Sequence, residues 1–295
     1  MYLPLPRQFF YAVYRLEIRL RRLKDNKQAW KTGSAFVLAD GRGSPWVVTN
    51  RHVIDPQYGH TEVVDIAVED IFLVGRRADD SRYRIRIIPT ATKLVHSDPE
   101  NDVVLLQPFV SEPKDPNNRI HWHFSVGHLA TVAEFDSDIF PGEPIHICGF
   151  PGQCDRLGYR PIMRTGHIAS DPRYDYSTSD QPMGSRVAYD GFALPGSSGS
   201  PVIAPARSRY PSVLEMRQPR LIGVNALYAT ELIEFTLTLP DDPKQGHEKP
   251  PELDSVEQTT PSSRTKRQTL LTHSGISIFF KSTVILEILD KEKYL

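Results

Sequence analysis

The stretch FALPGSSGSPVI, residues 192–203, gathers glycine, proline and serine between two apolar flanks. At its centre the run GSSGSP leads directly into the apolar residues Val202 and Ile203. Gly196 can adopt the positive φ that a tight loop demands, because glycine lacks a Cβ atom. A serine in such a turn is a candidate nucleophile, but it needs a base within reach and an acid to orient that base.

Two segments earlier in the chain supply candidates for these partners. His52 lies in VVTNRHVID, where an apolar strand ends and the chain turns. Asp102 lies in ENDVVLL, at the start of a strongly apolar strand, so we expect its carboxylate to be partly buried. Asp98 stands in the polar turn before it and is the weaker candidate. The chain therefore offers a base, an acid and a nucleophile in the order His, Asp, Ser.

The composition is that of a globular protein with no strong overall charge. The 295 residues are 39% hydrophobic and 24% charged, which suffices for one large β domain or for two lobes. The formal net charge of -1 provides no field for nucleic acid or anionic lipid, so neither is expected as a partner. We find neither a secretory signal nor an apolar run of about 20 residues, and we expect a cytoplasmic protein.

Cysteine and histidine usage favours no metal site and no disulfide framework. The two cysteines, Cys148 and Cys154, fit a reducing compartment. They cannot form a zinc site with His146 alone, and His121 and His123 have no further ligands nearby in the sequence. We expect no metal and no cofactor.

Short apolar segments separated by turns favour an all-β sandwich or barrel. Apolar and charged residues alternate over residues 14–21, which indicates a strand with one solvated face rather than a membrane-surface helix. One terminal helix is expected, with Ser282 or Thr283 as its N-cap. The expected strands are SAFVLA (34–39), WVVTN (46–50), DIFLV (70–74), YRIRII (83–88), DVVLLQ (102–107), PIHICGF (144–150), VIA (202–204), LIGVNALY (221–228) and GISIFF (275–280).

Taken together, the motifs resemble those of the trypsin-like (chymotrypsin-fold) serine peptidases, in the bacterial-type branch without disulfides. TNRHV is similar to that family's Thr-Ala-Ala-His motif, NDVVLL to its Asp-Ile-Ala-Leu motif, and PGSSGSPV to its Gly-Asp-Ser-Gly-Gly-Pro motif. The resemblance covers residues 12–292. It implies a catalytic triad of His52, Asp102 and Ser198, and an oxyanion hole formed by the backbone N–H groups of Gly196 and Ser198. It also implies that Gly199 leaves room for the substrate's carbonyl carbon.

The same resemblance implies a double six-stranded β-barrel with a C-terminal helix, and a polypeptide substrate. A single specific protein is the narrower alternative for that substrate. The domain prediction comprises an N-terminal extension (1–11), a first barrel (12–110), a connector (111–135) and a second barrel with the helix (136–292). The second barrel contains an insertion (240–269) that we expect to be disordered, because it has almost no apolar residues.

Two departures from the family pattern concern packing and control. Asn50 and Arg51 stand where the family prefers alanine, so Arg51 must find solvent or a partner. No Ile-Val-Gly-Gly-like activation sequence opens the catalytic region. We therefore expect control by a regulatory partner, by the insertion (240–269) or by rearrangement of the active-site loops, and not by zymogen cleavage.

The resemblance also locates the primary specificity pocket, along Phe192, Ala193, Asn225 and Leu227. No acid stands at Phe192, which disfavours selection for Arg or Lys, and Asn225 replaces the histidine of glutamate-selecting relatives. We expect a shallow apolar pocket for small or medium aliphatic residues.

Two other functions are alternatives to an active serine endopeptidase. A catalytically silent pseudopeptidase would use the same barrels as a protein-binding module. An esterase of the α/β-hydrolase type is disfavoured, because that fold places its nucleophile before the acid and the histidine, and no alternation of strands and helices is present.

Overall fold

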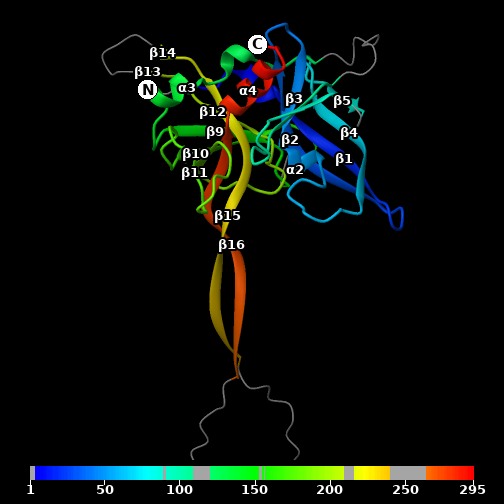
Figure 1. Ribbon diagram of the computed structural model, residues 1–295, viewed down its shortest axis with the longest axis vertical. Helices are drawn as coiled ribbons and strands as arrows, with labels where there is room; N and C mark the ends of the chain where they lie inside the picture. The colour runs from blue at the N-terminus through cyan, green and yellow to red at the C-terminus, as the bar shows by residue number, and fades with distance from the viewer. Residues whose placement is uncertain are drawn as a thin grey trace, which may run out of the picture. The chain divides into compact units, whose positions relative to one another are not determined.

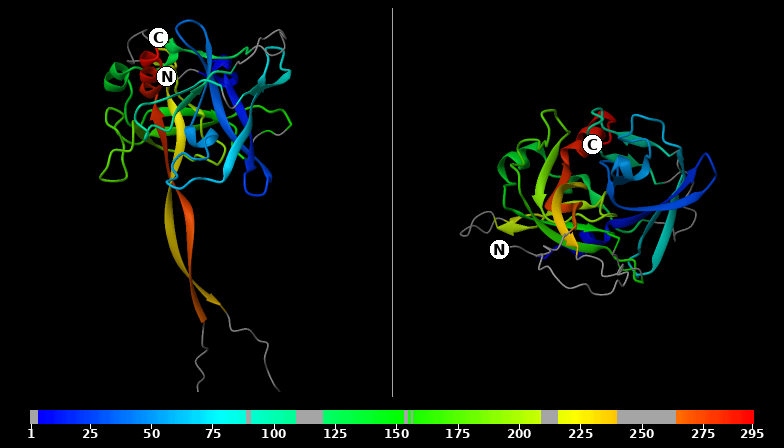
Figure 2. Two further views of the ribbon diagram at one scale, coloured as in Figure 1. Left: turned by 45° about the vertical axis from the view of Figure 1, so that its right-hand side comes forward. Right: turned by 90° about the horizontal axis from the view of Figure 1, so that it is seen from below.

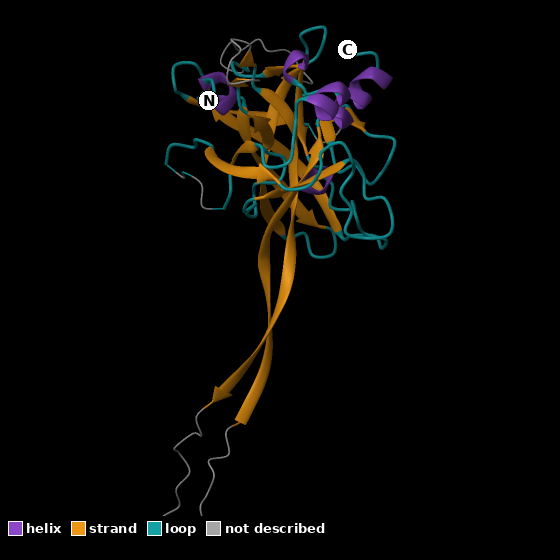
Figure 3. Cartoon of the chain, turned by 90° about the vertical axis from the view of Figure 1, so that its left-hand side faces the viewer, coloured by secondary structure: helices purple, strands orange, loops and turns teal. Residues whose placement is uncertain are grey.

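The computed structural model describes residues 4–88, 91–108, 120–152, 155, 157–208, 216–239 and 264–295. The chain divides into two compact units, one formed by Met1–Tyr228 with Gly275–Leu295 and the other by Ala229–Ser274. Strands dominate the described residues, and the helices are short (Figure 3). The expected all-β fold class is confirmed.

The first half of the larger unit is an eight-stranded sheet. Its hydrogen-bonded order is β5-β4-β1-β2-β3-β7-β6, and β8 pairs with β2 in parallel. Within the described residues no pairing joins β5 to β6, and this half together with the barrel of the second half is consistent with the expected all-β chymotrypsin-like fold. Its strands are β1 (Val13–Arg22), β2 (Gln28–Ala39), β3 (Pro45–Thr49), β4 (Ile66–Arg76), β5 (Arg82–Ile87), β6 (Lys93–Val95), β7 (Val104–Leu106) and β8 (Phe124–Ser125).

The second half is a closed six-stranded barrel, in the order β10-β11-β16-β15-β12-β9. Figures 1 and 2 show the sheet and this barrel side by side. The barrel strands are β9 (Pro144–Gly149), β10 (Ile162–Ile168), β11 (Arg186–Asp190), β12 (Pro201–Ala204), β15 (Arg220–Leu239) and β16 (Arg264–Lys281). The short strands β13 (Arg207–Ser208) and β14 (Met216–Arg217) form a separate pair.

Short helices lie between and after these strands. They are α1 (Arg7–Tyr11), α2 (Arg51–Ile54), the 3-10 helix η2 (Val126–His128), α3 (Val132–Ser137) and α4 (Thr283–Lys291). Ser282 precedes α4, as the sequence predicts for an N-cap, but its hydroxyl donates to the carbonyl of Ala130 at 2.7 Å and caps no helical N–H.

Burial follows the sequence pattern most clearly in β1. Tyr14, Leu16 and Ile18 are fully buried, whereas the arginines and the glutamate between them are partly exposed. This alternation confirms a strand with one buried face. A hydrophobic cluster that includes Phe36, Cys148 and four side chains of α4 then joins the sheet, the barrel and the terminal helix.

Two expected boundaries differ from the structure. Residues 264–269, which we assigned to a disordered insertion, form part of β16, and residues 240–263 lie outside the described residues. The expected connector (111–135) contains β8, η2 and the start of α3, while residues 109–119 lie outside the described residues. The apolar side chains of Phe124, Leu129 and Phe135 explain this order, because each is buried in a hydrophobic cluster.

A buried ion pair joins β14 to the residue before β9. Arg217 contacts the carboxylate of Glu143, and each residue is only 4% exposed. The same guanidinium donates to the carbonyls of Asp138 at 2.7 Å and Pro205 at 3.1 Å. Its hydrogen bonds satisfy most of its donors, as a buried charge requires.

We expect Arg217→Met to lower the free energy of unfolding by about 3–5 kcal/mol, because it leaves the Glu143 carboxylate buried with little compensation. Arg207→Met is the matched control: Arg207 lies 3.6 Å from the same carboxylate but is partly exposed, so its loss is expected to cost about 1 kcal/mol or less. Urea denaturation of both variants checks this. Equal losses in the two variants would contradict it.

Candidate active site

His52 and Asp102 are brought together by the ends of two neighbouring strands. β3 leads into the single turn of α2, which carries His52, and Asp102 lies two residues before β7, which pairs with β3. The imidazole Nδ1 lies 2.5 Å from Asp102 Oδ2, and the backbone N–H of His52 donates to Asp102 Oδ1 at 2.9 Å. An ionised carboxylate only accepts hydrogen bonds, so Nδ1 carries the proton and Nε2 presents its lone pair.

Asp102 is more deeply buried than the sequence suggested, at 3% exposure. Asn50 helps to fix this loop, because its side-chain amide donates to the carbonyl of Asp102 at 2.7 Å. Asn50 is itself fully buried, which gives a physical reason for an amide where the family prefers alanine. Arg51 has found a partner: its guanidinium lies 4.6 Å from the centroid of the Tyr58 ring.

Ser198 lies in the loop between β11 and β12, and its hydroxyl donates to the backbone carbonyl of Ala226 at 2.9 Å. It makes no hydrogen bond to His52 in this structure. Val53, the residue after His52, and Ser198 nevertheless both border Gly33 of β2: a Cβ atom there would lie 2.6 Å from the Val53 side chain and 3.7 Å from the carbonyl oxygen of Ser198. The short helix and the serine loop therefore pack against the same point of β2.

Two backbone features of the serine loop bear on the predicted oxyanion hole, which stays a prediction. Gly196 has φ +92, a conformation that favours glycine. The carbonyl of Pro195 accepts from the N–H of Gly152 at 2.9 Å, and in a trans peptide the N–H of Gly196 points the opposite way. Among the described residues, the N–H groups of Gly196 and Ser198 have no hydrogen-bond acceptor, so both remain available to a ligand.

Ser34 of β2 holds this loop through hydrogen bonds, and the sequence did not predict this role. Its hydroxyl donates to the carbonyl of Gly196 at 2.8 Å and accepts from the N–H of Phe150 at 2.8 Å. Its backbone N–H donates to the carbonyl of Ser198 at 2.9 Å, and its carbonyl accepts from the hydroxyl of Thr49 at 2.8 Å. The sequence marks Ser34 only as the first residue of an expected strand.

Gly199 is required by the packing of the protein itself. Its φ is +85, and a Cβ atom there would lie 2.0 Å from the carbonyl oxygen of Ser34 and 2.3 Å from the hydroxyl of Thr49. The space that a Cβ atom would need is filled by Ser34 of β2 and Thr49 of β3. The expectation that this glycine leaves space for substrate stays a prediction.

The four residues expected to line the primary pocket differ in exposure. Phe192 is 56% exposed, Ala193 is buried, and the side chain of Leu227 lies outside the described residues. Asn225 is fully buried; its amide donates to the carbonyl of Ser197 at 3.0 Å and accepts from the hydroxyl of Tyr189 at 2.6 Å. Any influence of Asn225 on specificity must therefore act through the serine loop.

Lys31 is a second residue near His52 that no motif identified. Its ammonium donates to the backbone carbonyl of His52 at 2.6 Å. Burial lowers the pKa of Lys31, and the nearby charge of Asp102 opposes that change. The charge of Lys31 therefore lies within the electrostatic range of the pair formed by His52 and Asp102.

The other groups considered from the sequence take no visible part in a site. Cys148 is fully buried in β9, and burial raises the pKa of its thiol to about 12. Cys154 lies outside the described residues. Within the part of the chain that the structure describes, no three His, Cys, Asp or Glu side chains gather as metal ligands, and no helix has the length and apolarity needed to cross a membrane.

Comparison with known families shows the class of protein to which this fold belongs. Residues 33–209 match the model of the trypsin-like peptidase domain. Because this match covers more than half of the chain, the protein belongs to that family.

Two solved structures are similar to this chain. The crystal structure of Deg5 is 20% identical, with a TM-score of 0.44 over 74% of this chain and 79% of that chain. The HtrA-type protease AlgW with decapeptide is 15% identical, with a TM-score of 0.47 over 96% of this chain and 64% of that chain, so less than two thirds of AlgW is spanned. No curated protein matches the chain significantly.

We expect Ser34→Ala to lower the free energy of unfolding by about 2–4 kcal/mol, because it leaves the N–H of Phe150 and the carbonyl of Gly196 buried without partners. Ser137→Ala is the control, since its hydroxyl is exposed and returns to the carbonyl of Ala133. Thermal and urea denaturation measure the difference. A loss no larger than that of the control would show that Ser34 does not fix the loop.

Proposed function

We propose that the protein is a serine endopeptidase that cleaves peptide bonds through an acyl-enzyme on Ser198. The observation that carries the proposal is the contact between His52 and Asp102. One carboxylate oxygen bonds the imidazole Nδ1 and the other accepts from the backbone N–H of His52, which orients the ring and leaves Nε2 able to accept a proton. Membership of the trypsin-like peptidase family supports a polypeptide substrate.

In the proposed reaction, the Ser198 hydroxyl first leaves the carbonyl of Ala226 and turns toward His52. Nε2 takes the hydroxyl proton as the serine oxygen attacks the carbonyl carbon of the substrate. The resulting oxyanion accepts hydrogen bonds from the N–H groups of Gly196 and Ser198. One such donor contributes about 3–4 kcal/mol to transition-state stabilisation in comparable sites.

The second half of the reaction uses the same groups. The imidazolium returns its proton to the departing amine, which breaks the peptide bond and leaves an ester on Ser198. Water, deprotonated by Nε2, then hydrolyses this ester and restores the hydroxyl. The carboxylate of Asp102 stays ionised throughout and stabilises the positive charge that appears on His52.

A protein-binding module without activity is the second candidate, and one observation favours it. The Ser198 hydroxyl is bonded to Ala226 and not to His52, so the nucleophile is not aligned in this structure. The same observation fits an enzyme that a regulatory partner or a substrate aligns. We further propose a cytoplasmic location, which the cysteine usage supports.

Reaction with a fluorophosphonate probe separates the enzyme from the binding module. We expect the probe to label the full chain covalently and Ser198→Ala to abolish labelling, because Ser198 lies beside the available backbone N–H groups of Gly196 and of Ser198 itself. Ser197→Ala and Ser200→Ala are matched controls in the same loop and should remain labelled. Absence of labelling in the unaltered chain, with and without a polypeptide substrate present, would favour the binding module.

We expect Asp102→Asn to lower kcat by about 10⁴-fold while the fold is retained. Because the backbone N–H of His52 holds one oxygen of this side chain, the amide nitrogen of asparagine would face Nδ1 and donate to it. The imidazole proton would then move to Nε2, which could no longer accept the serine proton. Asp98→Asn, in the turn before it, is the control and should keep its activity.

A further inference from the structure

A cavity of about 430 Å³ lies beside the candidate active site and takes no part in the chemistry described above. It is lined by the segment after His52, including Tyr58, and by Pro99 and Glu100, just before Asp102. Arg51 and Arg186 complete its wall. None of the residues expected to form the primary pocket lines it, so it is a separate binding surface.

Arg186 is a buried charge that the protein itself leaves poorly compensated. Its side chain is only 8% exposed, and its nearest carboxylate, that of Glu100, lies 4.0 Å away. Among the described residues its guanidinium makes no hydrogen bond, and its Nε is buried without a partner. It lies 5.1 Å from the centroid of the Phe280 ring, which supports its face but satisfies no N–H donor.

Arg51 presents a second guanidinium to the same cavity. It lies on the ring of Tyr58, and its nearest carboxylate, on Asp55, is 3.9 Å away. This guanidinium also makes no hydrogen bond within the described part of the chain. Two planar groups with unused N–H donors therefore face one space, and such groups match the geometry of a carboxylate.

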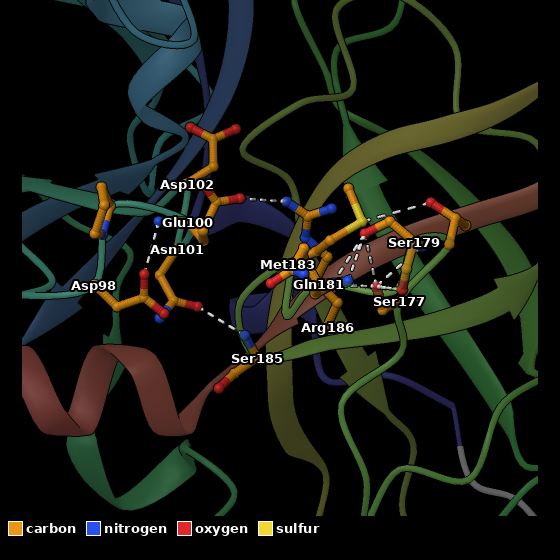
Figure 4. Close-up of polar contacts among 12 residues, drawn as sticks. Asp98, Glu100, Asn101, Asp102, Ser177, Ser179, Gln181, Met183, Ser185 and Arg186 are labelled. Atoms are coloured by element: carbon orange, nitrogen blue, oxygen red, sulfur yellow. Dashed lines mark hydrogen bonds and ion pairs between the residues drawn. The ribbon is translucent and has the colours of Figure 1, made fainter.

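The nearby carboxylates of the described residues do not accept hydrogen bonds from the guanidinium groups of Arg51 and Arg186. Both oxygens of Asp102 are bonded to His52, so its carboxylate is committed. Glu100 has a side chain that is 55% exposed, and it reaches Arg186 only at the limit of an ion pair. Figure 4 shows Glu100 facing Arg186, while Asn101 accepts from the N–H of Ser185 at 2.9 Å and holds the two loops together. Glu100 thus occupies a position that another carboxylate can take.

We propose that this cavity is a substrate subsite that binds an Asp or Glu side chain near the cleaved bond, with Arg186 and Arg51 as its specificity-determining residues. The inference rests on the proposed peptidase function and adds a substrate class to it. The acidic residue stands at a position other than the cleaved residue, whose side chain belongs to the primary pocket. Burial lowers the pKa of Arg186, in keeping with a charge that lacks a close partner in the free protein.

Cleavage of a proteome-derived peptide library by the full chain tests the proposal. Mass spectrometry of the products should show Asp and Glu enriched at one position within about four residues of the cleaved bond. Matched peptides with Glu or Gln at that position should then differ by roughly ten- to hundredfold in kcat/KM, as expected for a charge-assisted contact. In Arg186→Met this ratio should fall to about one.

Three further variants keep the test decisive. Arg51→Gln lies at the edge of the cavity, so it preserves the buried packing and should lower the ratio in part. Glu100→Gln removes the competing carboxylate and should raise the ratio. Arg186→Lys retains a charge without the planar fork, and it should recover part of the preference.

Fluorophosphonate labelling, measured on every variant, separates the two proposals. No labelling of the unaltered chain would defeat the peptidase function itself. Equal labelling of all variants, with an acidic preference that responds as described, supports the subsite. A labelled protein that shows no acidic enrichment, or keeps the same enrichment in Arg186→Met and Arg51→Gln, overturns the subsite and leaves the peptidase function standing.

Discussion

The hydrogen bonds of Ser34 are the constraint on which the rest of the site depends. This one residue of the sheet half contacts the serine loop, the end of β9 and the end of β3. The nucleophile loop belongs to the barrel and His52 belongs to the sheet, so their relative position is set where the two halves meet. Ser34 is fully buried, and its hydroxyl both donates and accepts a hydrogen bond at this place. It therefore fixes the relative position of the two halves with a small side chain.

The sequence predicted the fold class from local patterns, and it predicted the pairing of His52 with Asp102 from the motifs that resemble those of the family. Alternation in β1 and the apolar runs of β3 and β7 determine which faces are buried, and the two side chains lie at the ends of paired strands. The roles of Ser34, Asn225 and Lys31 were not predictable. Each acts through contacts with residues far away in the chain, and a serine, an asparagine or a lysine in a strand carries no pattern of its own.

The polar composition of one segment led to a prediction of disorder, although strand pairing outweighs composition there. Residues 264–269 are polar, yet they continue β16, which runs beside β15. Likewise, Arg51 interrupts a motif of small residues, and the structure gives it an aromatic partner and a place in a cavity wall. The charge of Arg51, which the sequence alone suggests would disturb the packing, is therefore a candidate for substrate recognition.

The bond between the Ser198 hydroxyl and Ala226 has a consequence for kinetics. Leaving it requires rotation about a single side-chain bond, and exposed side chains change rotamer within picoseconds to nanoseconds. A neutral hydrogen bond of this kind is worth about 0.5–1.5 kcal/mol, so the alternative orientation is populated in at least roughly 7% of molecules. Any slow lag before turnover would therefore have to arise from movement of the backbone and not from the resting position of the nucleophile.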